Sequence, residues 1–387
     1  MTLAPRSLVI VAVAVLSALA AGALLPLARD RPVVPVATRA APIAPVAQAP
    51  HVAPPTRIPA AEPVPALLEV TAAATCGERI VAAVGPWLRA ATGEGPWAPD
   101  RRVDLRSGSR HGFGRVDAIA CTLDAAFVLT TSSGDPLVEL IVVAGLAGPG
   151  DPAQAGSAET PVPGPLVHGV DVELDGGIAW VTTIDPGRLH AVDVASGSPA
   201  VIGSIELPEA FAWSGLAPRL AIGADRAFVA MNGGVAVIDI ADPRALRLVG
   251  EVAAPGDPNL DEPFADAIDV SVVGGSLAVT SSEGVCIQAL GEAREATDRH
   301  VAACLHLGPG SWRVAGWHAD RPTLFTSLLE PGTDRRQGIA YAVIADDAAP
   351  DARVSVSRWL PARRMATVRM LGQRLVGVTE AGVVPVE

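Results

Sequence analysis

The sequence contains no lysine, so its 29 basic residues are all arginine, and 41 acidic residues give a formal net charge of −12. Proteins that bind nucleic acids draw most of their affinity from basic surfaces that neutralise phosphates. This chain is acidic and has no basic stripe. We therefore expect no nucleic acid among its partners.

Motifs for several kinds of catalysis are also missing. The four cysteines have no C-x-x-C spacing for zinc or redox chemistry, and the seven histidines do not form an H-E-x-x-H pair. There is no G-x-S-x-G nucleophile elbow and no phosphate-binding loop. Whether the chain is an enzyme stays open, with a non-catalytic protein favoured.

One long apolar run is present, from Leu8 to Leu27, after a short N-terminus that carries Arg6. Its length, roughly 30 Å as a helix, suffices to cross a bilayer. We expect residues 1–28 to be a signal anchor that spans the membrane. The alternative is a cleaved signal peptide, because Ala18-Leu19-Ala20 and Ala21-Gly22-Ala23 both resemble peptidase sites.

Two further segments precede the main domain. Residues 29–65 carry proline every three to five positions with alanine and valine between, which predicts a disordered, extended linker. Residues 66–100 begin with apolar residues at mixed three- and four-residue spacings, from Leu67 to Leu88. We expect them to form a short helical cap.

From residue 101 onward the sequence repeats. A turn followed by an apolar strand recurs six times, and its aligned residues are 53, 48, 50, 46 and 52 positions apart: Phe127, Trp180, Phe228, Ala278, Leu324 and Val376. Four short strands per unit of this length are typical of a propeller blade. We predict an all-β, six-bladed β-propeller over 101–387, with five or seven blades as alternatives.

The last unit ends after about three strands, so the prediction needs a spare strand from elsewhere. Residues 103–107 (VDLRS) at the start of the domain could supply it. Pairing of the two ends would then close the ring and remove the free sheet edges.

Two of the units carry a family resemblance. Residues 227–252 (AFVAMNGGVAVIDIADPRALRLVGEV) resemble the LVIVD repeat, and residues 179–205 match it nearly as well. The other units agree with it in period only. The resemblance implies a bacterial propeller at the cell surface or in the periplasm, and no single chemistry.

The cysteines suit an oxidising compartment, where disulfides form. A hairpin folded around residue 295 would place Cys286 opposite Cys304, and a Cys76–Cys121 bond would join the cap to the first blade. Four buried free thiols are the alternative.

Polar residues on the innermost strands are the candidates for a ligand site, because these strands line the channel of a propeller. Asp117, Asp171, Arg219 and Asp269 occupy the aligned inner position, and His168 lies near Asp171. Three carboxylates could bind calcium. In the alternative that we favour, they accept backbone amides as part of the repeat, and no cofactor is expected.

These observations predict a membrane-anchored propeller outside the cytoplasm that acts as a protein-interaction or ligand-binding scaffold. Its partner would be an envelope protein or a surface ligand. The alternative is a lactonase-like propeller hydrolase with a divalent cation in the channel.

Overall fold

The computed structural model describes most of the chain from residue 69 onward. Pro63–Glu387 form one compact unit. The expected membrane segment (1–28) and linker (29–65) lie outside the described residues. The described ranges are 69–98, 102–107, 109, 113–132, 138–145, 153–160, 168–184, 187–195, 199–208, 219–231, 234–252, 267–273, 275–282, 284–290, 303–307, 312–318, 321–329, 336–343, 360–361 and 365–386.

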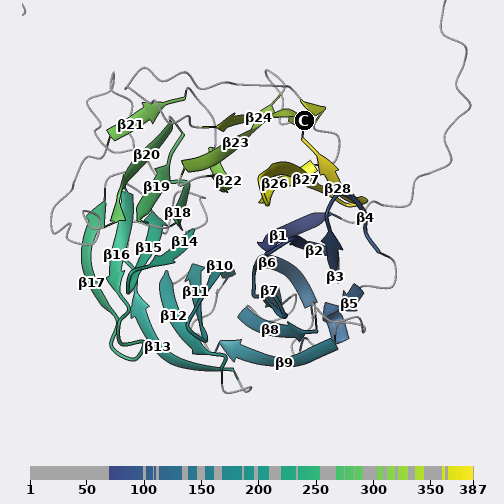
Figure 1. Ribbon diagram of the computed structural model, residues 1–387. Coiled ribbons are helices and arrows are strands. Elements are labelled where there is room, and N and C mark those ends of the chain that lie inside the picture. Colours follow the sequence, from purple (N-terminus) through teal and green to yellow (C-terminus); the bar gives the residue numbers. More distant parts are fainter. Residues whose placement is uncertain are drawn as a thin grey trace, which may run out of the picture. The chain divides into compact units, whose positions relative to one another are not determined.

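The described residues form seven antiparallel sheets of four strands each, arranged around a centre (Figure 1). We call them blades 1 to 7. Blade 1 comprises β1 (Val70–Cys76), β2 (Arg79–Val84), β3 (Trp87–Thr92) and β5 (Arg102–Asp104). Blade 2 comprises β6 (Phe113–Cys121), β7 (Ala125–Ser132), β8 (Val138–Ala144) and β9 (Ala153–Thr160). Blade 3 comprises β10 (His168–Asp175), β11 (Ile178–Ile184), β12 (Arg188–Asp193) and β13 (Ala200–Glu206).

Blades 4 to 7 continue around the ring. Blade 4 comprises β14 (Leu220–Gly223), β15 (Arg226–Met231), β16 (Gly234–Asp239) and β17 (Arg247–Val252), and blade 5 comprises β18 (Asp269–Val273), β19 (Ser276–Thr280), β20 (Gly284–Ala289) and β21 (Ala303–His306). Blade 6 comprises β22 (Arg313–His318), β23 (Arg321–Leu329), β24 (Arg336–Val343) and β25 (Leu360–Pro361). Blade 7 comprises β26 (Met365–Leu371), β27 (Arg374–Thr379), β28 (Gly382–Pro385) and β4 (Gly95–Pro96). A short 3₁₀ helix, η1 (Leu105–Ser107), follows β5.

The prediction of an all-β propeller is confirmed, and its six repeats coincide with blades 2 to 7. Each aligned residue, from Phe127 to Val376, lies in the second strand of its blade. The expectation of a helical cap over 66–100 is wrong, because this segment supplies the strands of a further blade. The ring therefore has seven blades, which was one of the alternatives.

Local chemistry explains why this segment forms strands. Two-residue turns join β1 to β2 and β2 to β3, and each begins with a glycine in the left-handed region: Gly77 (φ 62°) and Gly85 (φ 57°). The intervening strand β2 is buried along almost its whole length. A strand covered on both faces shows no alternation of polar and apolar residues, so its pattern resembles that of a buried helix.

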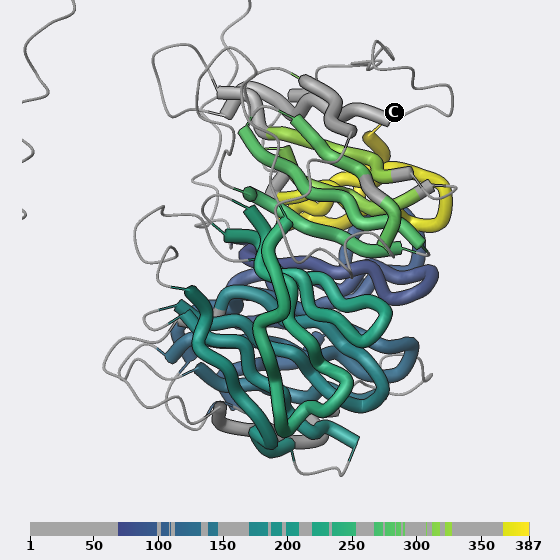
Figure 2. Tube along the Cα trace, turned by 90° about the vertical axis from the view of Figure 1, so that its left-hand side faces the viewer, coloured from purple at the N-terminus to yellow at the C-terminus, as the bar shows by residue number. Residues whose placement is uncertain are grey.

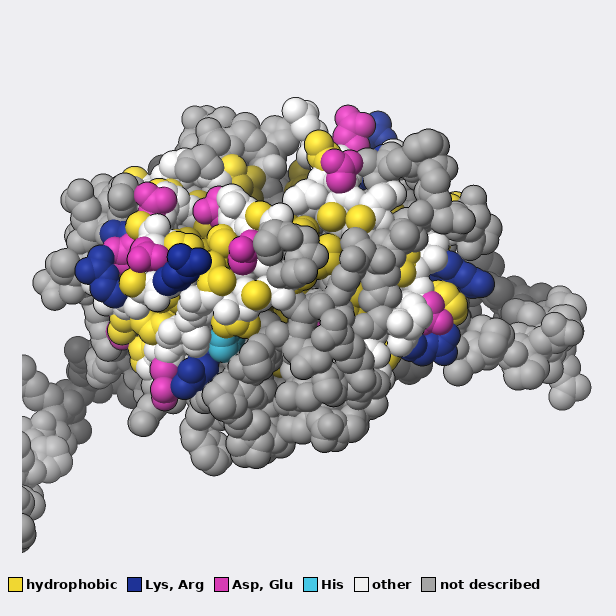
Figure 3. Space-filling view, turned by 90° about the horizontal axis from the view of Figure 1, so that it is seen from below, with side chains coloured by type: hydrophobic (Ala, Val, Ile, Leu, Met, Phe, Trp, Pro, Cys, Tyr) yellow, Lys and Arg dark blue, Asp and Glu magenta, His cyan; other side chains and the backbone are white. Residues whose placement is uncertain are grey.

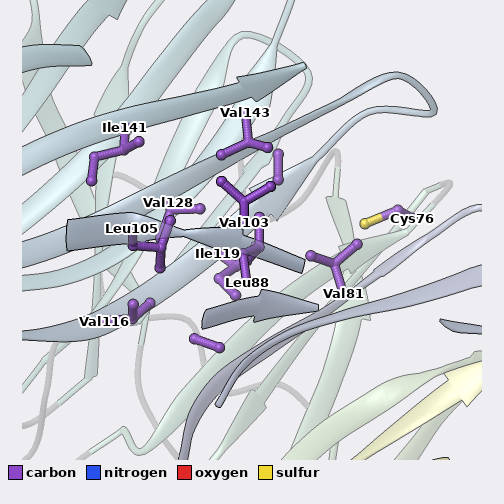
Figure 4. Close-up of a cluster of buried hydrophobic side chains, with 12 residues drawn as sticks. Cys76, Val81, Leu88, Val103, Leu105, Val116, Ile119, Val128, Ile141 and Val143 are labelled. Atoms are coloured by element: carbon purple, nitrogen blue, oxygen red, sulfur yellow. The ribbon is translucent and has the colours of Figure 1, made fainter. Parts of the chain in front are cut away.

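Buried apolar side chains fill the space between neighbouring blades. The cluster in Figure 4 joins blade 1 to blade 2 and includes Val81, Leu88, Val116 and Ile141. Similar clusters occupy the other six interfaces around the ring. Each sheet is therefore covered by its neighbours on both faces, which stabilises a closed ring.

The ring closes where its two ends meet. In Figures 1 and 2 the purple strands of blade 1 lie against the yellow strands of blade 7, and β1 contacts β26. After β3 the chain crosses to blade 7 and adds β4 to its outer edge, with Gly95 opposite Val383. It then returns as β5, the outer strand of blade 1. Closure by pairing of the two ends is confirmed, but the spare strand is 95–96, and 103–104 stay in blade 1.

Candidate functional site: the central channel

The first strand of each blade faces the centre, and these seven strands contact one another in order around the ring. They enclose a cavity of about 690 Å³. Pockets that bind small molecules commonly have volumes of about 300–1,000 Å³. Six ionisable side chains line the cavity: Asp171, Glu173, Arg219, Asp269, Arg313 and Arg369.

The carboxylate of Asp171 connects blade 3 to blade 4. Oδ1 accepts a hydrogen bond from the amide of Val172 (3.0 Å), and Oδ2 accepts one from the amide of Leu220 in the next blade (3.0 Å). A guanidinium nitrogen of Arg219 lies 3.6 Å from Oδ1. Burial is the main influence on the pKa of Asp171 and raises it, while Arg219 opposes this shift.

Asp269 makes the equivalent connection between blades 5 and 6. Its Oδ1 accepts a hydrogen bond from the amide of Val270 (3.0 Å), and its Oδ2 accepts one from the amide of Val314 (2.9 Å). These bonds match those of Asp171 strand for strand. The interpretation of these aspartates as structural parts of the repeat is therefore supported by their geometry.

Asp117 also occurs on a first strand, β6, but it is not among the residues that line the cavity. Its two oxygens accept hydrogen bonds from Arg115 Nε and Thr131 Oγ1. The structure thus brings Asp171, Asp269 and Arg219 together and leaves Asp117 apart. His168 begins β10, and its side chain lies outside the described residues.

The same bonds bear on the alternative of a calcium site. Each of the six oxygens of Asp117, Asp171 and Asp269 already accepts a hydrogen bond from the protein. Within the described part of the chain, no three acidic, histidine or cysteine side chains are grouped as a metal site requires. A divalent cation would therefore compete with bonds that these carboxylates already make within blade 2 and between neighbouring blades.

Three ionisable residues of the cavity escaped the sequence analysis: Glu173, Arg313 and Arg369. Glu173 follows the aligned residue Asp171 by two positions on β10. Arg369 likewise follows Thr367, which holds the corresponding place on β26, by two positions. Alternate residues of a strand share a face. This period of two was the available signal, and extending the aligned inner position by two residues would have found both.

Arg369 connects the last blade to the first. Its Nε and Nη2 donate to the carbonyl oxygen of Ala73 in β1 (3.2 and 2.9 Å), while Nη1 donates to Thr367 Oγ1 and to the carbonyl of Val368 (both 2.9 Å). Burial lowers the pKa of Arg369 to about 10, and the charge of Arg219 adds to this effect. The side chain stays protonated at neutral pH and serves mainly as a structural link.

Glu173 differs from these residues, because its side chain is open to the space of the channel although protein surrounds it. The surrounding protein raises its pKa to about 8, and the charges of Asp171 and Asp269 add to the shift. Near neutral pH, a proton on Glu173 would remove one negative charge from the channel.

A disulfide between Cys76 and Cys121 joins β1 to β6, as predicted, and Cys121 lines the cavity. Cys286 and Cys304 are opposite each other in β20 and β21, as the predicted hairpin requires. Cys286 is disulfide-bonded, but the side chain of Cys304 lies outside the described residues, so their pairing stays a prediction. Disulfides of this kind indicate an oxidising compartment.

Comparison with known proteins gives no family for this chain. No protein-family model matches it, and no curated protein matches it. Solved structures that are similar include the WD40 domain of SCAP from fission yeast (11% identity, TM-score 0.49, covering 82% of this chain and 80% of that one). BamB from Moraxella catarrhalis is also similar (15% identity, TM-score 0.48, covering 82% and 96%).

Proposed function

We propose that this protein is a β-propeller scaffold, tethered to a membrane outside the cytoplasm, that binds an envelope protein or a surface ligand. The observation that carries the proposal is the use of Asp171 and Asp269 as connections between blades. Their carboxylates stabilise a rigid ring with an open channel instead of forming a catalytic group. The resemblance of two blades to the LVIVD repeat supports the same class of protein.

The proposed location has separate support. The Cys76–Cys121 disulfide suits an oxidising compartment, and the apolar run 8–27 is long enough to act as an anchor. That run lies outside the described residues. Among the residues that the structure describes, no helix is long and apolar enough to cross a membrane.

The described surface fits a partner other than nucleic acid. On the face seen in Figure 3, acidic and basic side chains lie next to one another among apolar ones. A mixed surface of this kind does not favour a polyanion over other partners. This part of the proposal rests on the charge pattern and on the net charge of −12.

Localisation can be tested by expressing the full chain, and a form without residues 1–28, in a bacterium. We expect the full chain in the membrane fraction with cysteines that do not react with a thiol reagent until reduced. The shortened form should remain in the cytosol with reactive thiols. The mass of the exported protein distinguishes a retained anchor from a cleaved signal. A full chain found reduced in the cytosol would refute the location.

The hydrolase alternative can be tested on the purified full chain. Elemental analysis before and after a chelator should find no stoichiometric calcium, and the melting temperature should not change. One tightly bound calcium per chain, whose removal abolishes lactone hydrolysis, would favour the enzyme instead. Crosslinking in the cells that make the protein, followed by identification of the crosslinked molecules, would then reveal its partner.

A further inference from the structure

The charged side chains of the channel differ in how far their polar atoms are engaged in hydrogen bonds. Asp171, Asp269 and Arg369 use their polar atoms for bonds between or within blades. In the described part of the chain, the guanidinium group of Arg219 has a single charged contact, the 3.6 Å approach to Asp171. That distance is too long for a hydrogen bond. Arg219 therefore presents N–H donors to the cavity.

The positive charges of the channel also lie close enough to affect one another. Burial is the main cause that lowers the pKa of Arg369, and the charges of Arg219 and Arg313 add to it while those of Asp269 and Asp171 oppose it. The three arginines belong to blades 4, 6 and 7. Like charges that converge on one cavity repel, and an anion placed among them relieves that repulsion. A guanidinium group can also bind a carboxylate or phosphate through two parallel hydrogen bonds.

The acidic side chains offset these charges only in part. Asp171 and Asp269 each accept hydrogen bonds from two backbone amides, which partly offset their negative charge. Glu173 is the remaining acid, and its neighbours favour its protonated form. A protonated Glu173 adds a hydrogen-bond donor to a channel that then has three arginines against two carboxylates.

From this geometry we propose that the central channel binds a small molecule with a carboxylate or phosphate group, and that Arg219 is the residue that holds this group. The inference rests on the proposed function, since it names the ligand class of a ligand-binding propeller. The cavity of about 690 Å³ has room for such a molecule. Arg313, two blades further around the ring, would add long-range attraction.

The test is calorimetric titration of the purified full chain in mild detergent with sodium succinate, inorganic phosphate and putrescine, at constant ionic strength set with chloride. We expect saturable binding of succinate or phosphate, and the stronger of the two identifies the preferred group. Arg219→Gln should weaken this binding at least tenfold. Arg374→Gln, which changes an exposed arginine in blade 7, should leave it unchanged.

A second variant keeps the test informative if Arg219→Gln unfolds. Binding of succinate to the unaltered chain should weaken as pH rises from 6 to 9, because ionised Glu173 repels the carboxylates, which are themselves already ionised in this range. The charged groups that face Glu173 across the cavity are Asp171, Asp269, Arg219, Arg313 and Arg369. Glu173→Gln should remove most of the pH dependence without abolishing binding.

Three results would overturn the proposal: no binding of either anion, preferential binding of putrescine, or equal affinities for the Arg219→Gln and Arg374→Gln variants. These results would leave the membrane location and the crosslinked partner untouched, since those are measured in cells. Conversely, a chain that binds succinate but lies in the cytosol would refute the proposed location and not the anion site.

Discussion

The guanidinium group of Arg369 donates two hydrogen bonds to the carbonyl oxygen of Ala73, which lies 296 residues earlier in the chain. This contact links the first strand of the last blade to the first strand of blade 1. Thr75 Oγ1 donates in the opposite direction, to the carbonyl of Met370 (2.9 Å). The inner edge of the ring is therefore held at its junction by side-chain bonds, while β4 and β28 hold the outer edge.

Replacing Arg369 with alanine should lower the free energy of unfolding by about 1–3 kcal/mol, because it leaves the carbonyl of Ala73 without its donor. Urea unfolding of the full chain measures the change. Arg374→Ala is the matched control. Arg374 is exposed, and its 3.7 Å approach to Glu94 is too long for a hydrogen bond. Its effect should stay within about 0.5 kcal/mol. Equal effects of the two variants would refute a role for Arg369 in closure.

Gly382 allows the outer strands to meet. Its φ is 156°, and a Cβ atom there would collide with the carbonyl oxygen of Gly95 and with Pro96. Gly382→Ala should therefore destabilise the protein by about 2–5 kcal/mol through backbone strain and displacement of β4. Gly372 (φ 60°) has open space where its Cβ would lie, so Gly372→Ala should cost only about 1 kcal/mol.

Thermal melting of the two glycine variants gives this comparison directly. The indole nitrogen of Trp97 donates to the carbonyl of Thr379 (3.0 Å), which places a fluorescent side chain beside the junction. Trp97 emission should shift to longer wavelength in Gly382→Ala and not in Gly372→Ala. If both variants melt together with unchanged emission, the outer junction does not depend on Gly382.

The Cys76–Cys121 bond should stabilise the ring by about 2–4 kcal/mol, because it closes a loop between residues 45 positions apart. The Cys76→Ala, Cys121→Ala double variant should show this loss in urea unfolding. The same measurement in a background with Cys286 and Cys304 replaced by alanine isolates the bond from any second one. A reductant should destabilise that background protein, which retains Cys76 and Cys121. It should not change the stability of the variant in which all four cysteines are replaced by alanine. An equal response of both proteins would contradict the expected contribution.

His190 predicts sensitivity to acid. Burial lowers its pKa to about 4, and the charge of Arg188 adds to the effect. In the unfolded chain its pKa is about 6.5, so between these values the unfolded state binds more protons. Stability should therefore fall as pH drops from about 6.5 to 4. His190→Gln can still bond Thr183, which lies 3.4 Å from His190 Nε2, and should lose less stability over this range. Parallel acid-unfolding curves would contradict the prediction.

The repeat was readable from the sequence because each blade places an apolar second strand after a tight turn, as Trp180 and Phe228 show. The roles of Asp171 and Asp269 followed from the same alignment. Blade 1 was not readable, since β2 is buried on both faces and its residues do not alternate. Neither was β4, because a two-residue strand that pairs with the far end of the chain has no local pattern. The free donors of Arg219 depend on distances that only the folded ring defines.

The crossing of β4 to blade 7 also sets the order of events during synthesis. A growing chain carries the outer strand of its final blade from about residue 95, long before its partner at 382–383 exists. Six blades can form as the ribosome proceeds, but β4 cannot pair until residues 382–383 have been made. A chain that ends before residue 382 therefore leaves β27 and β4 of blade 7 without their common partner β28 and presents these unpaired edges to proteases and chaperones.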